Sequence, residues 1–261
     1  MFIGKMGPEP IPARVYALYK IVKNAGEIKK DEIRKKMEHK ISDGGTSYFP
    51  MIYNTAVELD IIKNDDSGMT KITHNFDSIN DFKKYVCLLL EKNFNDSHFY
   101  KTTRAIISMN KEVLDEKLTN NNFINKIQNL TKENIDENEM RGWRFWAKFL
   151  GFGYEHDMYF LPNAYIFLRT ILPECELEKG VEMPIDIFIN KVEKYGKILF
   201  EENKKELSLC LSAALRELHE NKEIKLVYQN DQGKGVTLYP SNRYFSQPVT
   251  SIVYKGVTIN E

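Results

Sequence analysis

The segment 141–150 combines basic and aromatic side chains in a spacing that suits contact with a nucleic acid. Successive residues of a helix turn by about 100°, so Arg141, Arg144 and Lys148 share one face, with Phe145 beside them and two tryptophans nearly opposite. Basic groups hold phosphates, and aromatic rings stack on bases or wedge between them. We therefore expect this basic stripe and Phe145 to bind double-stranded DNA. The alternative is a solvated basic face on a helix whose tryptophans are core.

Two further groups of basic residues are weaker candidates for phosphate contact. The first lies on an expected second helix. The second joins an expected third helix to a hairpin tip, where a lysine stands between two glycines. The alternatives are a solvated helix face for the first group and a tip kept soluble by its charge for the second. The residues are Lys29, Lys30, Arg34 and Lys35 in the first group and Arg216 and Lys234 in the second.

Motifs of enzyme active sites are missing from the sequence. There is no phosphate-binding loop, dinucleotide-binding glycine pattern or nucleophile elbow. The five histidines are scattered without metal-ligand spacing, and the turn 155–157 is too short for its three side chains to converge on one ion. The paired carboxylates 201–202 suit a helix start at the surface. We therefore expect no catalytic residue, no metal site and no cofactor, and we predict that the protein is not an enzyme.

Composition narrows the class of protein further. The 261 residues are 42% hydrophobic, which is enough to bury cores, and no apolar run approaches the ~20 residues of a membrane-spanning helix. Lys plus Arg and Asp plus Glu both number 37, so any contact with DNA must come from a local patch. The three cysteines are far apart, as in a reducing compartment, and the first 12 residues lack a signal-peptide layout. These features predict a cytoplasmic protein without membrane contact.

Helical periodicity and turn residues predict the elements that position these side chains. Near the N-terminus, Val15, Leu18 and Val22 share a helix face, and Gly26 can end that helix. The expected order is helix, short strand, helix capped by Asp31, loop, helix, strand, turn and strand. The corresponding ranges are 12–24, 27–28, 31–37, 42–46, 50–59, 61–62, 65–68 and 70–73.

The C-terminal third repeats this order in our prediction. A helix opens at Pro184, a small strand and a short second helix follow, and a long third helix leads into a hairpin with strong turn residues. The expected ranges are 184–196, 198–199, 201–205, 207–218, 224–228 and 236–239, with the hairpin turn at 230–235. Residues 249–254 could add an edge strand between the subunits of a homodimer.

This element order resembles the winged-helix family, so the fold class we expect is mainly α with small β-hairpins, in two or three winged-helix modules in tandem. The predicted domains are 1–79, 80–175 and 176–261. The middle domain is expected to be helical. Its helix 139–150, followed by strands at 151–154 and 158–161, is either a degenerate third winged helix or part of a plain bundle with a hairpin.

The resemblance implies that the third helix of a module binds DNA, yet the third helix of the first module is poorly suited to this role. No Lys or Arg lies between Pro50 and Asp60. The outward face of this helix instead carries Tyr48, Met51 and Thr55, which suit a protein partner.

Two hypotheses about function remain, and both place the protein in a larger complex. The segments 142–153 and 161–162 resemble winged-helix accessory proteins of bacterial DNA-modification and anti-phage defence clusters. The first hypothesis is a DNA-binding accessory subunit of such a system. The second is an adaptor that binds protein subunits of the complex. A transcriptional regulator or a replication initiator is a further possibility of the same family.

Overall fold

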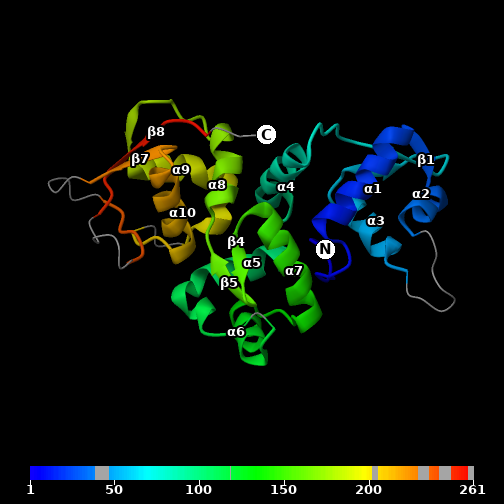
Figure 1. Cartoon of the computed structure of the whole chain (residues 1–261), viewed down its shortest axis with the longest axis horizontal. Coiled ribbons are helices and arrows are strands. Elements are labelled where there is room, and N and C mark those ends of the chain that lie inside the picture. The colour runs from blue at the N-terminus through cyan, green and yellow to red at the C-terminus, as the bar shows by residue number, and fades with distance from the viewer. Residues whose placement is uncertain (39–46, 118, 202–204, 229–234, 241–247, 258–261) are drawn as a thin grey trace.

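The computed structural model describes residues 1–38, 47–117, 119–201, 205–228, 235–240 and 248–257. These residues form a mainly helical protein with small antiparallel sheets. The N-terminal elements lie on one side, the C-terminal sheet and its helices lie on the other, and the middle helices join them (Figure 1). Within the described part of the chain, no helix is both long and apolar enough to cross a membrane.

The N-terminal elements follow the predicted order. Strand β3 lies between β1 and β2 in an antiparallel sheet. One detail of the prediction is wrong: Asp31 lies in the first turn of the second helix, and the capping position is Lys29. The predicted loop 42–46 lies outside the described residues. The elements are α1 (Pro12–Ala25), β1 (Glu27–Lys29), α2 (Lys30–Met37), α3 (Phe49–Glu58), β2 (Ile62–Asn64) and β3 (Met69–Ile72).

The middle region consists of helices followed by one hairpin, as predicted. The last of these helices leads directly into the two strands, which pair with each other in an antiparallel sheet. The elements are α4 (Ile79–Asn93), α5 (His98–Ser108), the 3-10 helix η1 (Asn110–Leu114), α6 (Asn121–Thr131), α7 (Glu137–Leu150), β4 (Gly153–His156) and β5 (Tyr159–Pro162).

The C-terminal region differs from the prediction in several places. The expected strand 198–199 is a 3-10 helix, and the expected hairpin partner 236–239 does not pair with β7. Val236 bridges to Val249 and Thr237 to Glu206, so this stretch is held away from β7. The predicted helix 201–205 and turn 230–235 fall largely outside the described residues. The elements are α8 (Tyr165–Ile171), η2 (Leu172–Glu174), β6 (Glu182–Pro184), α9 (Ile185–Gly196), η3 (Lys197–Leu199), α10 (Leu209–Glu220), β7 (Ile224–Val227) and β8 (Ser251–Tyr254).

The two three-stranded sheets have the same connectivity. In each sheet the last strand in the sequence lies in the middle, giving the orders β1-β3-β2 and β6-β8-β7. By this connectivity α8 corresponds to α1, and α9 takes the second helical position, not the first position predicted for it. The proposed edge strand 249–254 is also wrong, because β8 is hydrogen-bonded on both sides within the chain.

One continuous cluster of buried apolar side chains runs through all three regions. The segment 1–10, for which the sequence predicted no element, belongs to this cluster. The Phe2 ring packs against Phe94, Phe99 and Trp146, with ring centroids 5.2, 5.2 and 4.9 Å away. The start of the chain is therefore anchored among α4, α5 and α7.

This anchor predicts a large loss of stability on truncation of Phe2. We expect Phe2→Ala to lower the free energy of unfolding by about 3–5 kcal/mol, because it leaves a cavity between three aromatic rings. Equilibrium unfolding in urea measures the change. Ile3→Ala is the control, since the Ile3 side chain is 75% exposed and its loss should cost less than about 0.5 kcal/mol. Equal effects of the two substitutions would contradict the anchoring role of Phe2.

Candidate functional site

Helix α7 carries the predicted nucleic-acid stripe, and local sequence signals define both of its ends. Asp136 and Glu139 form a capping box, in which each carboxylate accepts a hydrogen bond from the backbone N–H of the other residue. Gly151 ends the helix in the left-handed conformation, at φ 88°. Trp143 and Trp146 are fully buried. The basic side of α7 is thereby turned outward.

The three cations of this stripe are paired with carboxylates of the same chain. Arg141 pairs with Glu137 one turn earlier. Arg144 Nη1 lies 2.9 Å from Glu155 Oε1, and Lys148 Nζ lies 3.0 Å from Glu155 Oε2. Glu155 belongs to β4, so the hairpin brings its carboxylate against the helix. A phosphate at the predicted stripe would have to compete with these carboxylates.

Phe145 flanks the stripe, as its helical position predicts. Its ring is partly exposed and lies 5.3 Å from the Arg144 guanidinium carbon. The Arg144 side chain is itself only 17% exposed. The guanidinium therefore stacks on a ring and pairs with a carboxylate at the same time, which leaves little of its surface for a ligand.

The basic residues of α2 are more open. Lys29, which ends β1 and caps α2, and Lys30, Arg34 and Lys35 of α2 are all exposed. Lys30 Nζ lies 4.3 Å above the Tyr53 ring, and Arg34 pairs weakly with a glutamate four residues later, at 3.4 Å. For the lysines of this group, the described residues offer no carboxylate within 4 Å. The α2 face is thus a solvated cluster of cations.

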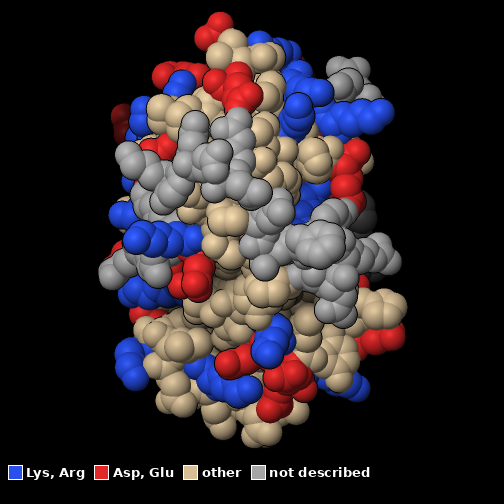
Figure 2. All heavy atoms as spheres, turned by 90° about the vertical axis from the view of Figure 1, so that its left-hand side faces the viewer, with Lys and Arg blue, Asp and Glu red and all other residues tan. Residues whose placement is uncertain are grey.

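The remaining basic residues that were predicted to contact DNA do not join these groups into one continuous strip. Arg216 is half-buried and donates a hydrogen bond to the Tyr239 carbonyl oxygen at 2.6 Å, and burial lowers the pKa of its guanidinium. Lys234 lies outside the described residues. Helices α2, α7 and α10 lie well apart (Figure 1), and on the face formed by the C-terminal region the described acidic and basic side chains are interspersed (Figure 2).

The predicted partner-binding face on α3 is only partly exposed. The Tyr48 and Met51 side chains are each 47% exposed. Thr55 is 1% exposed, so its expected position on the outward face is wrong. Helical spacing alone places Thr55 beside Met51, but the segment 1–10 packs against this end of α3. Glu58, one turn further, accepts hydrogen bonds from the amino group of Met1 at 2.9 Å and from the backbone of Ile3.

A groove of about 700 Å³ lies between the segment 1–10, α3 and the start of α7. Its surface is mostly apolar, and half of the polar side chains in its lining are carboxylates. Sequence reasoning missed this site, because residues 1–10 show no helical or strand periodicity that would indicate how they pack. The lining residues are Met1, Ile3, Gly4, Lys5, Gly7, Pro8, Glu9, Pro10, Met51, Asn54, Thr55, Val57, Glu58, Asp136, Asn138 and Glu139.

Contacts with α7 fix the far wall of this groove. Trp146 Nε1 donates to the Pro10 carbonyl oxygen at 2.8 Å, and the Met6 N–H donates to Glu139 at 3.4 Å. Gly142 lets the backbone of residues 6–7 lie against the helix, since a Cβ there would come within 2.1 Å of the Met6 carbonyl oxygen. The glycine that interrupts the basic stripe is therefore needed for a close approach of two backbones.

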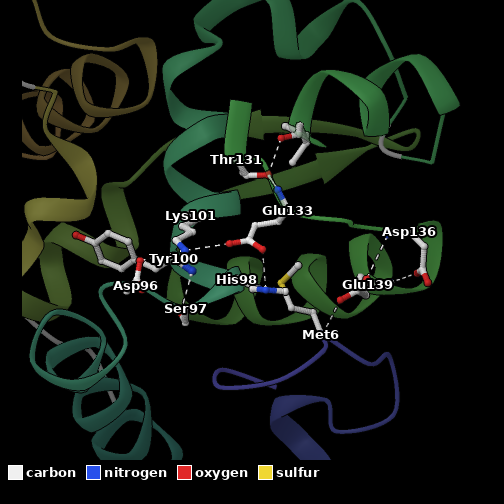
Figure 3. A network of polar contacts seen from close by, with 11 residues as sticks. Met6, Asp96, Ser97, His98, Tyr100, Lys101, Thr131, Glu133, Asp136 and Glu139 are labelled. Atoms are coloured by element: carbon white, nitrogen blue, oxygen red, sulfur yellow. Dashed lines mark hydrogen bonds and ion pairs between the residues drawn. The ribbon is translucent and has the colours of Figure 1, made fainter. Parts of the chain in front are cut away.

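A polar network beside the groove holds the connection between α6 and α7 (Figure 3). Glu133 accepts a hydrogen bond from Lys101 at 2.9 Å, and its other oxygen lies 3.0 Å from His98 Nε2. Lys101 also pairs with Asp96 at 3.0 Å. The hydrogen bond from Lys101, assisted by the charge of His98, holds the pKa of Glu133 below its ordinary value. Residues of α5 thus fix the segment that leads into Asp136.

The described residues offer little for covalent or metal chemistry. Among them, no three His, Cys, Asp or Glu side chains are grouped to hold a metal ion. Burial raises the pKa of the Cys175 thiol to about 12 and the pKa values of Cys87 and Cys210 further still. These thiols are therefore protonated and unreactive at neutral pH.

Comparison of this chain with protein-family models, with curated proteins and with solved structures finds no match.

The network around Glu133 predicts a pH-dependent contribution to stability. Because the folded-state pKa of Glu133 lies below its ordinary value of 4.5, its pairing stabilises the fold above that pH and is lost as pH falls through the lowered pKa. We expect Glu133→Gln to lower the melting temperature by about 2 °C at pH 7 and by less at pH 3. Glu137→Gln, which removes an exposed pair on α7, is the control. A deficit that is the same at both pH values would contradict this role.

Proposed function

We propose that this protein is a non-enzymatic adaptor of the winged-helix type, which binds protein subunits of a bacterial DNA-handling or anti-phage defence complex. Two features support the winged-helix assignment. The order helix, strand, helix, helix, strand, strand occurs at both ends of the chain, and both sheets place the last strand in the middle. The assignment to a DNA-handling or defence complex follows from the sequence resemblance.

The observation that carries the adaptor proposal is the groove beside α3. A helix that reads DNA presents basic side chains to phosphates, whereas α3 has no Lys or Arg and contributes Met51 and Val57 to an apolar surface. The third helix of the C-terminal region is also unsuited to enter a DNA groove, because residues 209–219 of α10 are all buried or half-buried. Both third helices are therefore better suited to contacts other than DNA reading.

Substitution of Met51 tests this function. We expect the protein to co-elute in size-exclusion chromatography with a protein encoded beside its gene. Met51→Asp should weaken that complex about tenfold or more, because it places a carboxylate in an apolar contact. Ile187→Asp is a matched control on α9, since the Ile187 side chain is 45% exposed against 47% for Met51. A complex that tolerates Met51→Asp would argue against the groove as the binding site.

A second candidate function is DNA binding through α2. The specific observation in its favour is that the exposed lysines of α2 have no carboxylate partner among the described residues, unlike the cations of α7. We expect such binding to be independent of sequence and sensitive to salt, since it would depend on phosphate contacts.

Charge reversal on α2 tests DNA binding. In fluorescence anisotropy with a labelled duplex, the double variant Lys29→Glu/Lys35→Glu should bind about tenfold more weakly and lower the salt slope by about two. The control, Lys225→Glu/Lys255→Glu, makes the same charge change at an exposed position of β7 and at the exposed residue after β8. Equal loss in both double variants would show a dependence on overall charge alone. Loss of DNA binding in Arg144→Glu, but not in the α2 double variant, would indicate that α7 carries the binding site.

A further inference from the structure

The groove beside α3 has the shape of a site for a short protein segment. Along one wall, Met51, Asn54 and Val57 follow each other at three-residue spacing, and Met51 and Val57 are 47% and 43% exposed. The opposite wall is the segment 1–10, which contains neither helix nor strand. The volume of about 700 Å³ is in the range of sites that hold several side chains. Apolar side chains at this spacing usually receive apolar side chains of a partner.

The charge of the lining selects the chemistry of that partner. Four carboxylates line the groove, from Glu9, Glu58, Asp136 and Glu139, against two ammonium groups, that of Lys5 and the amino group of Met1, which pairs with Glu58. Glu58 and Glu139 accept hydrogen bonds from backbone N–H groups of residues 3 and 6. No described cation lies within 4 Å of the carboxylate oxygens of Glu9 or Asp136, since Arg14 reaches only the carbonyl oxygen of Glu9, so both charges remain available to a ligand. Such a lining repels phosphates and attracts lysine or arginine.

We propose that this groove binds a short apolar segment of a partner protein that carries lysine or arginine. Apolar side chains of the segment contact Met51 and Val57, and its cation pairs with Glu9 and Asp136. The inference rests on the adaptor function and specifies the partner surface. The anion site that a helix N-terminus usually offers is already filled at α7, because the Asp136 and Glu139 carboxylates cap its first amides.

Three labelled peptides of about ten residues, the length of α3, test the specificity. One contains Leu and Lys, the second contains Leu and Glu, and the third contains Ser and Lys. By fluorescence anisotropy against the full chain, we expect the Leu–Lys peptide to bind at least about tenfold more tightly than the other two. Preference for the Leu–Glu peptide, equal binding of all three peptides, or no binding of any would overturn the proposal.

Variants of the chain then locate the binding. Glu9→Gln/Asp136→Asn should weaken the Leu–Lys peptide about tenfold and reduce its salt dependence. Asn caps a helix as well as Asp does, so α7 keeps its cap. Asp157→Asn/Glu178→Gln is the control, since it removes two exposed carboxylates elsewhere. Val57→Ala should weaken the same peptide by loss of apolar contact. Unchanged affinity in both groove variants would overturn the proposal.

Two outcomes separate this inference from the adaptor function itself. If a neighbouring protein still requires Met51 while no Leu–Lys peptide binds, the adaptor function stands and the partner chemistry proposed here is wrong. If the wild-type chain self-associates in sedimentation and Met51→Asp makes it monomeric, the occupant is a second copy of this chain, and the proposal is also wrong.

Discussion

The burial of two indole rings on one helix determines much of this structure. Both tryptophans of the chain lie on α7, three residues apart, and both are fully buried. A buried indole N–H needs an acceptor, and each finds one on a different segment. Trp143 donates to Thr103 of α5 at 2.9 Å, and Trp146 donates to the carbonyl of Pro10 at 2.8 Å. The packing of α7 therefore fixes both the middle helices and the path of the N-terminal segment.

This constraint also determines how the charged side of α7 is used. With its apolar face committed to the core, the helix turns its cations toward the β4–β5 hairpin, where Glu155 pairs with two of them. The same helix contributes its first turn to the groove through Asp136 and Glu139. A stripe that suggested a nucleic-acid site is thus largely paired within the chain, and the more open ligand surface lies at the start of the helix.

Much of the fold could be predicted from local signals. The spacing of Val15, Leu18 and Val22 predicts α1, and the turn at 65–68 predicts the hairpin that follows α3. These predictions are correct because the residues on which they depend are neighbours in the sequence. The prediction of the strand that pairs with β7 was wrong. Its true partner β8 follows only after the long connection 228–250, whereas turn residues at 230–235 suggested a partner closer in the sequence.

The candidate site was predictable only in part, for the same reason. Tyr48 and Met51 lie on an exposed helix face, as their spacing indicates. Thr55 is buried although helical spacing places it beside Met51, and the segment 1–10, which contacts this end of α3 at Glu58, has no periodicity to reveal its packing. Likewise, the pairing of Arg144 depends on Glu155, whose direction is set by the register of the hairpin.

The three buried thiols have a practical consequence for measuring local opening. Cys87, Cys175 and Cys210 belong to α4, the turn after η2, and α10, and each thiol has a raised pKa. An alkylating reagent can modify each thiol only when its surroundings open. Mass spectrometry of the time course would then rank these parts of the core by their opening rates, without any engineered label.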